Sequence, residues 1–220
     1  MLWTDDNISE LKYLDMKFYN QEATPNGKSD ILRAAIVYEY GGVYIDADSQ
    51  WVNNMCLDDF MLLASDTGFI AAIEPGKTWA ASGVIGAVRH HPVSKLYQQA
   101  QVILSTGGRG GAPWQRLGPL GVSAAMTVAD NHASSQHCLA NVGSKIVLTQ
   151  QDFDENIPAA QSWLMTSLHS KYFYPTSWNS HSMSGQMTNL THVAELVKAK
   201  YPEAAMYQLG FTTHGFKPRL

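Results

Sequence analysis

The spacing of hydrophobic residues changes several times in the first quarter of the chain, and each change predicts a different element. Ile8 and Leu11 have helical spacing, so we expect "LWTDDN" to be the end of a strand followed by a helix. "TPNGK", residues 24–28, is typical of a turn, and Ser29 is a candidate N-cap for a helix over residues 30–40. That helix is apolar nearly all round, which predicts a buried position, and the following Gly-Gly pair predicts its end. "VYID" then predicts a strand.

Patterns of strand length and of helix length alternate over the rest of the chain. The segments "FMLLAS", "GFIAAI", "SGVIGAV" and "SKIVLT" predict strands, whereas "PVSKLYQQAQVIL", "VSAAMTVADNH" and the amphipathic "MTNLTHVAELVKAKYP" predict helices. Residues 105–121 are rich in glycine and proline and predict an irregular loop. Since no repeat and no long linker divides the chain, we expect one α/β domain over residues 1–220, with helices flanking a mixed sheet.

The composition adds limits to this picture. With 45% hydrophobic and 15% charged residues and a net charge of −4, the chain has the composition of a globular domain. It contains no basic run, so we expect no long-range attraction to nucleic acid or anionic lipid. Neither a leader peptide nor an apolar run of membrane-spanning length is evident, which predicts a cytoplasmic protein. Cys56 and Cys138 are expected to pack in the core.

Two opposite charges share one face of the helix predicted over residues 30–40. Asp30 and Arg33 are three residues apart, close to one helical turn. By itself, this pair is typical of an acidic residue favoured by the dipole at a helix start and of an intrahelical ion pair, each contributing only roughly a few tenths of a kcal/mol.

Two carboxylates follow the strand predicted after the glycines. In a strand, Tyr44, Asp46 and, if the strand continues, Asp48 point to the same side. Like charges at neighbouring positions repel, and a divalent cation is the simplest compensation. Oxygen ligands favour Mg²⁺, Mn²⁺ or Ca²⁺ over zinc. An EF-hand is excluded, because Trp51 and Leu57 occupy the positions at which that loop needs glycine and glutamate.

The combined run "SDILR" and "GGVYIDAD" resembles the sugar-binding segment with the Asp-x-Asp motif of glycosyltransferase family 32, which includes initiating mannosyltransferases and capsular-polysaccharide enzymes. It is also similar to the corresponding segment of the clostridial glucosylating toxins. "SGVIGAVRHHP" and "RLGPLGVSAA" resemble later segments of the family. The resemblance implies a GT-A fold, with a mostly parallel mixed sheet whose Asp-x-Asp strand end holds a metal-bound nucleotide-sugar.

The resemblance also implies roles for individual residues. Asp48 would ligate the metal directly, while Asp46 would contact the ribose of the nucleotide and, through water, the metal. Tyr44 would lie near the nucleoside. Asp30 and Arg33 would hold the hydroxyl groups of the donor sugar and the neighbouring phosphate.

Two features depart from the family pattern. The usual first strand, of the type "IPKIIHQIW", is missing. Either Trp3 or Trp51 stacks on the base instead, or the sequence is a truncated or naturally short form. The tail "THGFKPRL" is instead similar to the endings of glycogenin-like glycosyltransferases, which implies His214 as third metal ligand and Lys217 as diphosphate contact; His181 is the competing ligand.

These observations lead to one expected function. We expect a retaining glycosyltransferase that uses Mn²⁺ or Mg²⁺ to move a hexose from a nucleoside-diphosphate sugar, UDP-hexose or GDP-mannose, to a glycan or another hydroxyl acceptor. An inverting reaction would need a base, for which Asp152, Asp154 or Glu155 are the options. The alternatives are an inactive nucleotide-sugar-binding module and a nucleotide-sugar hydrolase.

Overall fold

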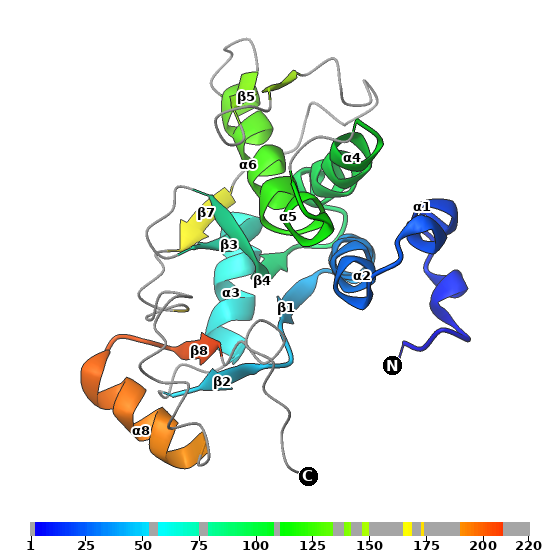
Figure 1. The fold of residues 1–220 in the computed structure, drawn as a ribbon. Coiled ribbons are helices and arrows are strands. Elements are labelled where there is room, and N and C mark those ends of the chain that lie inside the picture. Colours follow the sequence, from blue (N-terminus) through cyan, green and yellow to red (C-terminus); the bar gives the residue numbers. More distant parts are fainter. Residues whose placement is uncertain are drawn as a thin grey trace.

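The computed structural model describes residues 3–52, 57–74, 79–107, 111–133, 139–141, 147–149, 165–168, 173 and 190–208 (Figure 1). Its helical elements are the 3-10 helix η1 (Ile8–Glu10) and the α-helices α1 (Met16–Gln21), α2 (Pro25–Tyr40), α3 (Leu57–Thr67), α4 (Pro92–Thr106), α5 (Pro113–Leu117), α6 (Pro119–Ala133) and α8 (Leu190–Lys200). The strands are β1 (Gly42–Ile45), β2 (Ser49–Trp51), β3 (Phe69–Ile73), β4 (Ala80–Ala87), β5 (Leu139–Asn141), β6 (Val147–Thr149), β7 (Met165–Leu168) and β8 (Met206–Gln208).

The central sheet has four described strands in the order β1-β4-β3-β7. β4 pairs antiparallel with both β1 and β3, whereas β3 pairs parallel with β7. The predicted α/β class with a mixed sheet is therefore confirmed. Among the described pairings, however, antiparallel contacts outnumber the parallel one, because β3 and β4 follow each other with only a short connection between them and form a hairpin.

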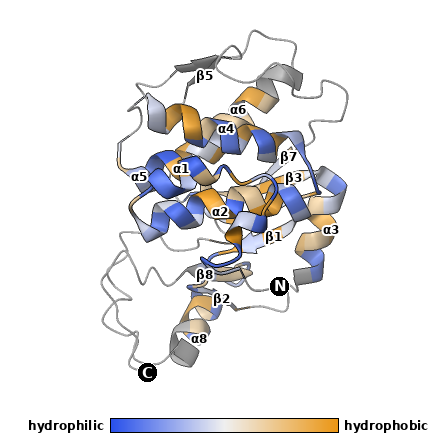
Figure 2. Ribbon diagram, turned by 90° about the vertical axis from the view of Figure 1, so that its right-hand side faces the viewer, coloured by the Kyte–Doolittle hydropathy of each residue, from blue (hydrophilic) through white to orange (hydrophobic). Residues whose placement is uncertain are grey.

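Helices cover both faces of this sheet, and the alternation of side chains along β3 shows how. Phe69 and Ala71 belong to one core, with residues of α2, α4 and α6. Ile70 and Ala72 belong to a second core on the opposite face, with residues of α3. Because both faces are covered, β3 is apolar at successive positions. In Figure 2, α2 lies in the middle of the molecule and carries many hydrophobic residues.

The helix that carries Asp30 begins earlier than predicted. α2 begins at Pro25, and the side chain of Thr24 caps it by accepting a hydrogen bond from the Gly27 amide at 3.1 Å. "TPNGK" is therefore the first turn of the helix and not a separate turn, and Ser29 is not the N-cap. Threonine as N-cap with proline at the first helical position is a favourable helix start. Asp30 consequently lies beyond the first turn, where the helix dipole has little effect.

Two further predictions of local structure were wrong. "FMLLAS" lies in α3, whose buried Phe60 and Ala64 are four residues apart and pack as one helical face. Residues 105–121 were predicted to be an irregular loop, but their described part includes the end of α4, all of α5 and the start of α6. Prolines stand at the first positions of α5 and α6, where a missing amide costs nothing.

The N-terminal segment contains a turn where a strand end was predicted. The amide of Asn7 donates to the carbonyl of Thr4 at 3.0 Å, and η1 follows directly. Ile8 and Leu11 are buried against α2 through Ile31 and Ala35. This segment therefore packs on the face of α2 opposite to the sheet.

A second, smaller sheet joins distant parts of the chain. β2 pairs antiparallel with β8, and Ser49 lies opposite Gln208 (Figure 1). The amide of Val52 extends the pairing by donating to the carbonyl of Ala205 at 3.0 Å. Within the part of the chain that the structure describes, no helix is both long and apolar enough for a membrane span.

Candidate active site

The reversal between α2 and β1 brings two charged residues of the helix next to the end of the strand. Gly41 ends α2 with φ 71°, and a Cβ at this position would lie 2.7 Å from the backbone nitrogen of Arg89. Only glycine adopts this conformation and tolerates this approach without strain. β1 then runs back along α2, so Asp46, directly after the strand, meets Arg33 of the helix.

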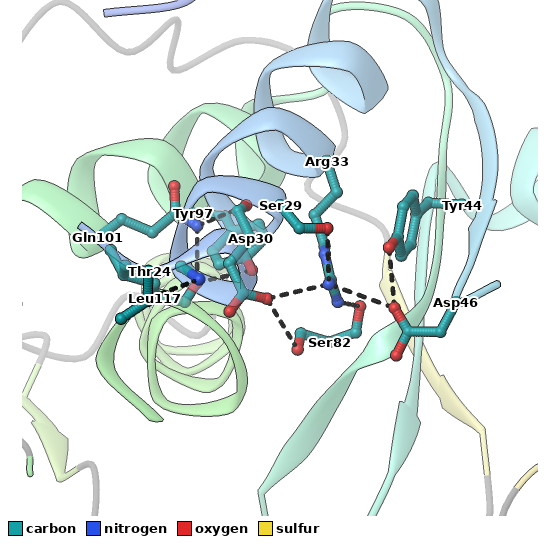
Figure 3. Close-up of polar contacts among 11 residues, drawn as sticks. Thr24, Ser29, Asp30, Arg33, Tyr44, Asp46, Ser82, Tyr97, Gln101 and Leu117 are labelled. Atoms are coloured by element: carbon teal, nitrogen blue, oxygen red, sulfur yellow. Dashed lines mark hydrogen bonds and ion pairs between the residues drawn. The ribbon is translucent and has the colours of Figure 1, made fainter. Parts of the chain in front are cut away.

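Arg33 connects two carboxylates that are 16 residues apart in the sequence. Its Nη2 lies 3.3 Å from Oδ1 of Asp30 and 3.2 Å from Oδ1 of Asp46 (Figure 3). Its Nη1 donates to the carbonyl of Ser82 at 2.6 Å, and Nη2 also donates to Oγ of Ser29 at 3.4 Å. The guanidinium is thus fixed in position by groups from α2, β1 and β4.

Tyr44 completes the contacts on the β1 side. Its hydroxyl donates to Oδ1 of Asp46 at 2.8 Å, and the guanidinium carbon of Arg33 lies 4.4 Å from the centre of its ring. A cation over a tyrosine face and a hydrogen bond to a carboxylate both stabilise this arrangement. The predicted candidates Asp30, Arg33, Tyr44 and Asp46 therefore form one connected group.

The same group includes Ser82 of β4, which sequence reasoning missed. Its hydroxyl donates to Oδ1 of Asp30 at 3.4 Å, in addition to the contact of its carbonyl with Arg33. The next carbonyl of the strand, that of Gly83, accepts the backbone amide of Asp46 at 2.9 Å. The available signal was a polar residue at the start of "SGVIGAV", an otherwise apolar strand.

Burial determines the charge states in this group. Asp30 is only 4% exposed and Arg33 7%. Burial raises the pKa of the Asp30 carboxyl to about 7, because its effect exceeds the opposing attraction of Arg33, and the Asp46 carboxylate adds to the increase. Burial acts to lower the pKa of Arg33, but the Asp30 and Asp46 carboxylates outweigh it and keep that pKa above its ordinary value. The Asp30 carboxyl is paired with one guanidinium, which it shares with Asp46, whereas the Arg33 guanidinium is paired with two carboxylates.

Helices α4 and α5 hold the backbone around Asp30. Nε2 of Gln101 donates to the carbonyl of Asp30 at 2.9 Å and to that of Leu117 at 2.6 Å. The hydroxyl of Tyr97 also donates to the carbonyl of Leu117, at 2.8 Å. Gln101 and Tyr97 are each 1% exposed, so these bonds are shielded from water and keep α2, α4 and α5 in register.

Asp48 lies in a turn, because β1 does not continue to it, which was the condition for its position on the same strand face as Asp46. β1 ends at Ile45, and the amide of Ser49 donates to the carbonyl of Asp46 at 3.0 Å, which closes a four-residue turn before β2. Two carboxylates in one turn are the hard oxygen ligands that Mg²⁺ and Mn²⁺ prefer, so these residues fit such an ion. Among the described residues, no group of three or more His, Cys, Asp or Glu side chains could hold a metal.

Trp3 and Trp51, the two candidates for stacking on the base, are not part of this group. Trp3 packs beside Tyr40, with ring centres 6.0 Å apart, at the end of α2 that lies about 15 Å along the helix from Asp30. Because Trp3 belongs with the η1 and α1 core, the structure does not bring it next to Asp46. Trp51 packs edge-on against Phe60 at 5.7 Å. His214, Lys217 and His181, and the possible bases Asp152, Asp154 and Glu155, lie outside the described residues.

Comparison with known proteins bears on the N-terminal part of the chain. Residues 1–68 match the model of a family described as "Glycosyltransferase sugar-binding region containing DXD motif". A solved structure described as "PaToxG Glycosyltransferase" is similar at 18% identity and a TM-score of 0.44; the match covers 60% of this chain and 47% of that chain. This chain therefore spans about half the length of the solved chain that it matches. No curated protein matches the sequence.

The segment matched by the family model contains α2, β1 and the turn that follows, and hence Asp30, Arg33, Tyr44, Asp46 and Asp48, whereas Ser82 lies outside it. Residues 1–68 are thus similar to the sugar-binding region of glycosyltransferases that carry an Asp-x-Asp motif, which confirms the predicted resemblance to glycosyltransferase family 32.

Proposed function

We propose that this chain is a metal-dependent retaining glycosyltransferase. It moves a hexose from a nucleoside-diphosphate sugar, with a UDP-hexose favoured and GDP-mannose as the second option, to a hydroxyl group of a glycan or another acceptor. The observation that carries the proposal is the chain of ion pairs from the buried residues Asp30 and Arg33 to the partly exposed Asp46, within the segment that matches a sugar-binding region.

Asp30 and Arg33 bind the donor in this proposal. Arg33 and Ser82 both contact Oδ1 of Asp30, and Oδ2 takes no hydrogen bond from the described residues (Figure 3). That oxygen accepts a hydroxyl group of the sugar. The guanidinium of Arg33 carries a full positive charge in a site shielded from water, where it attracts the phosphate next to the sugar.

Asp46 and Asp48 hold the metal and the ribose. Asp48 would ligate the ion directly, and Asp46 would contact the ribose and, through water, the ion. The ion, when bound, offsets the charge that develops on the departing diphosphate. His214 is the proposed third ligand and Lys217 the proposed diphosphate contact. Gln208 pairs with Ser49, next to Asp48, and His214 follows six residues later in the sequence; a stretch of six residues, at up to about 3.5 Å per residue, is long enough to reach back to this turn.

Fixed charges suit the chemistry of glycosyl transfer. The anomeric carbon becomes cation-like as the bond to the diphosphate breaks, so stabilisation of the leaving group matters more than a strong base. Asp30 is held by α2, α4, α5 and β4, which reduces the reorganisation needed when the sugar moves. The proposal of retained anomeric configuration rests on the family resemblance.

Thermal denaturation with Mn²⁺ and a panel of UDP-glucose, UDP-galactose, UDP-N-acetylglucosamine and GDP-mannose tests the proposal. A donor at about 100 times its Kd stabilises the native state by about 2.7 kcal/mol, and we expect one donor to do so only when Mn²⁺ is present. Absence of any metal-dependent shift would overturn the proposal. Acceleration of donor consumption by added oligosaccharide acceptors distinguishes a transferase from a hydrolase.

A further inference from the structure

We propose that Ser82 is a positioning residue for the donor sugar: it holds one oxygen of the Asp30 carboxyl, so that the other oxygen is directed to a sugar hydroxyl. This inference rests on the function proposed above and adds a residue of β4 to the site.

Ser82 contacts both members of the Asp30 and Arg33 pair through different atoms. The hydroxyl donates to Oδ1 of Asp30 at 3.4 Å, and the backbone carbonyl accepts Nη1 of Arg33 at 2.6 Å (Figure 3). Since Nη2 of Arg33 also lies 3.3 Å from Oδ1, that oxygen has two polar neighbours. The carboxyl group can turn away only if it loses both contacts, so Ser82 and Arg33 together fix its orientation and leave one oxygen for a ligand.

Gly118 restricts the same space from the side of α5. A Cβ at this position would lie 2.7 Å from Oγ of Ser82 and 3.2 Å from Oδ1 of Asp30. The backbone at the end of α5 is thus in close contact with the hydrogen-bonded pair. Because the amide of Gly118 donates to the carbonyl of Trp114 at 3.1 Å, this backbone is itself held in place. Asp30 therefore has little room for another rotamer on this side.

Replacement of Ser82 distinguishes the contact of its hydroxyl with Asp30 from the contact of its carbonyl with Arg33. Ser82→Ala removes the hydroxyl but keeps the carbonyl that holds Arg33. The Asp30 carboxyl then loses one of the two groups that orient it, while the ion pairs of Arg33 with Asp30 and Asp46 remain. A positioning role for the sugar predicts weaker binding of the nucleotide-sugar without weaker binding of the nucleotide. A purely structural role predicts equal losses for both.

Isothermal titration calorimetry of the full chain with Mn²⁺ tests this prediction. UDP with the three UDP-sugars named above, and GDP with GDP-mannose, are the probes, and Ser82→Ala, Ser82→Cys and Ser82→Thr are compared with the wild type. Ser94→Ala is the matched control, because Ser94 is a buried serine whose hydroxyl makes no hydrogen bond with the described residues. Cysteine conserves the volume and donates weakly, so it replaces the alanine variant if the latter does not fold.

We expect Ser82→Ala to bind the preferred nucleotide-sugar about five- to tenfold more weakly, with a change of less than about twofold for the corresponding nucleoside diphosphate. Ser82→Thr keeps the hydroxyl and is expected to recover the sugar affinity, whereas Ser94→Ala leaves both affinities unchanged. Equal losses for the nucleoside diphosphate and the nucleotide-sugar, or no loss for either, would overturn the role of Ser82 and leave the proposed function standing. If the wild type binds none of the nucleotide-sugars, the proposed function and this inference fail together.

Discussion

The protonation of Asp30 gives a prediction that needs no ligand. Its pKa in the folded protein is about 7, against an ordinary value of 3.8. Between these two pH values the native state binds a proton that the unfolded chain releases, so the contribution of Asp30 to stability falls as the pH rises. The difference of about 3 pKa units at about 1.36 kcal/mol each corresponds to a total of about 4 kcal/mol.

Most of the pH range between 3.8 and about 7 lies below the pH at which the protein is conveniently studied. Between about pH 5.5 and about pH 8, the same two pKa values give a loss of about 2 kcal/mol. Asp30→Asn removes the titrating group and keeps a side chain of the same shape. We therefore expect the stability of the variant, relative to the wild type, to increase by about 2 kcal/mol from the lower to the higher pH.

Urea denaturation of both proteins at the two pH values, without metal or donor, measures this difference. The two proteins differ only in this side chain, so pH effects that are common to both cancel in the comparison. Coincident transitions by circular dichroism and tryptophan fluorescence check that unfolding is two-state. A wild-type-to-variant difference that stays constant between the two pH values would refute the reasoning, as would a difference of opposite sign.

Four other substitutions give separate predictions. Arg33→Met leaves two carboxylates without their guanidinium, so we expect a loss of about 3–5 kcal/mol in urea denaturation; a loss below about 1 kcal/mol would contradict the buried ion pairs. Tyr44→Phe removes a hydrogen bond to a carboxylate and is expected to cost about 1.5 kcal/mol in the same assay, whereas no change would show that water replaces the hydroxyl fully. Gly41→Ala forces a Cβ against the backbone of Arg89 at positive φ, and we expect a loss of at least about 1–3 kcal/mol; an unchanged melting temperature would argue against this geometry. Asp48→Ala is expected to abolish Mn²⁺-dependent donor turnover with unchanged urea denaturation, and retained turnover would exclude Asp48 as a metal ligand.

Periodicity was sufficient for the elements whose environment is simple. "GFIAAI" and "SGVIGAV" became β3 and β4, and "PVSKLYQQAQVIL" became α4, because their patterns and their boundary residues agree. "FMLLAS" misled, since a short apolar run fits either a strand or one buried turn of helix. The prolines of α5 and α6 were interpreted as loop residues, although their positions suit helix starts.

The candidate site was only partly predictable. Asp30, Arg33, Tyr44 and Asp46 could be selected from one continuous segment, because a helix, a glycine reversal and a strand suffice to bring them together. Ser82 belongs to β4, which is distant from β1 in the sequence and lies beside it only in the folded sheet. The close approach of Gly118 to Ser82 depends on the packing of α5. Contacts of this kind have no local pattern, so the sequence alone did not reveal them.

The pairing of β2 with β8 has a consequence for the order in which this protein is assembled. The turn from Asp46 to Ser49 is synthesised early, yet its neighbouring strand finds its partner only when Met206–Gln208 has left the ribosome. Closing so long a stretch of chain is slow compared with forming a helix or a hairpin. During translation, the helix that holds Asp30 can therefore fold long before the carboxylate turn beside it is secured. The acidic turn can thus be secured only after β8 has been synthesised.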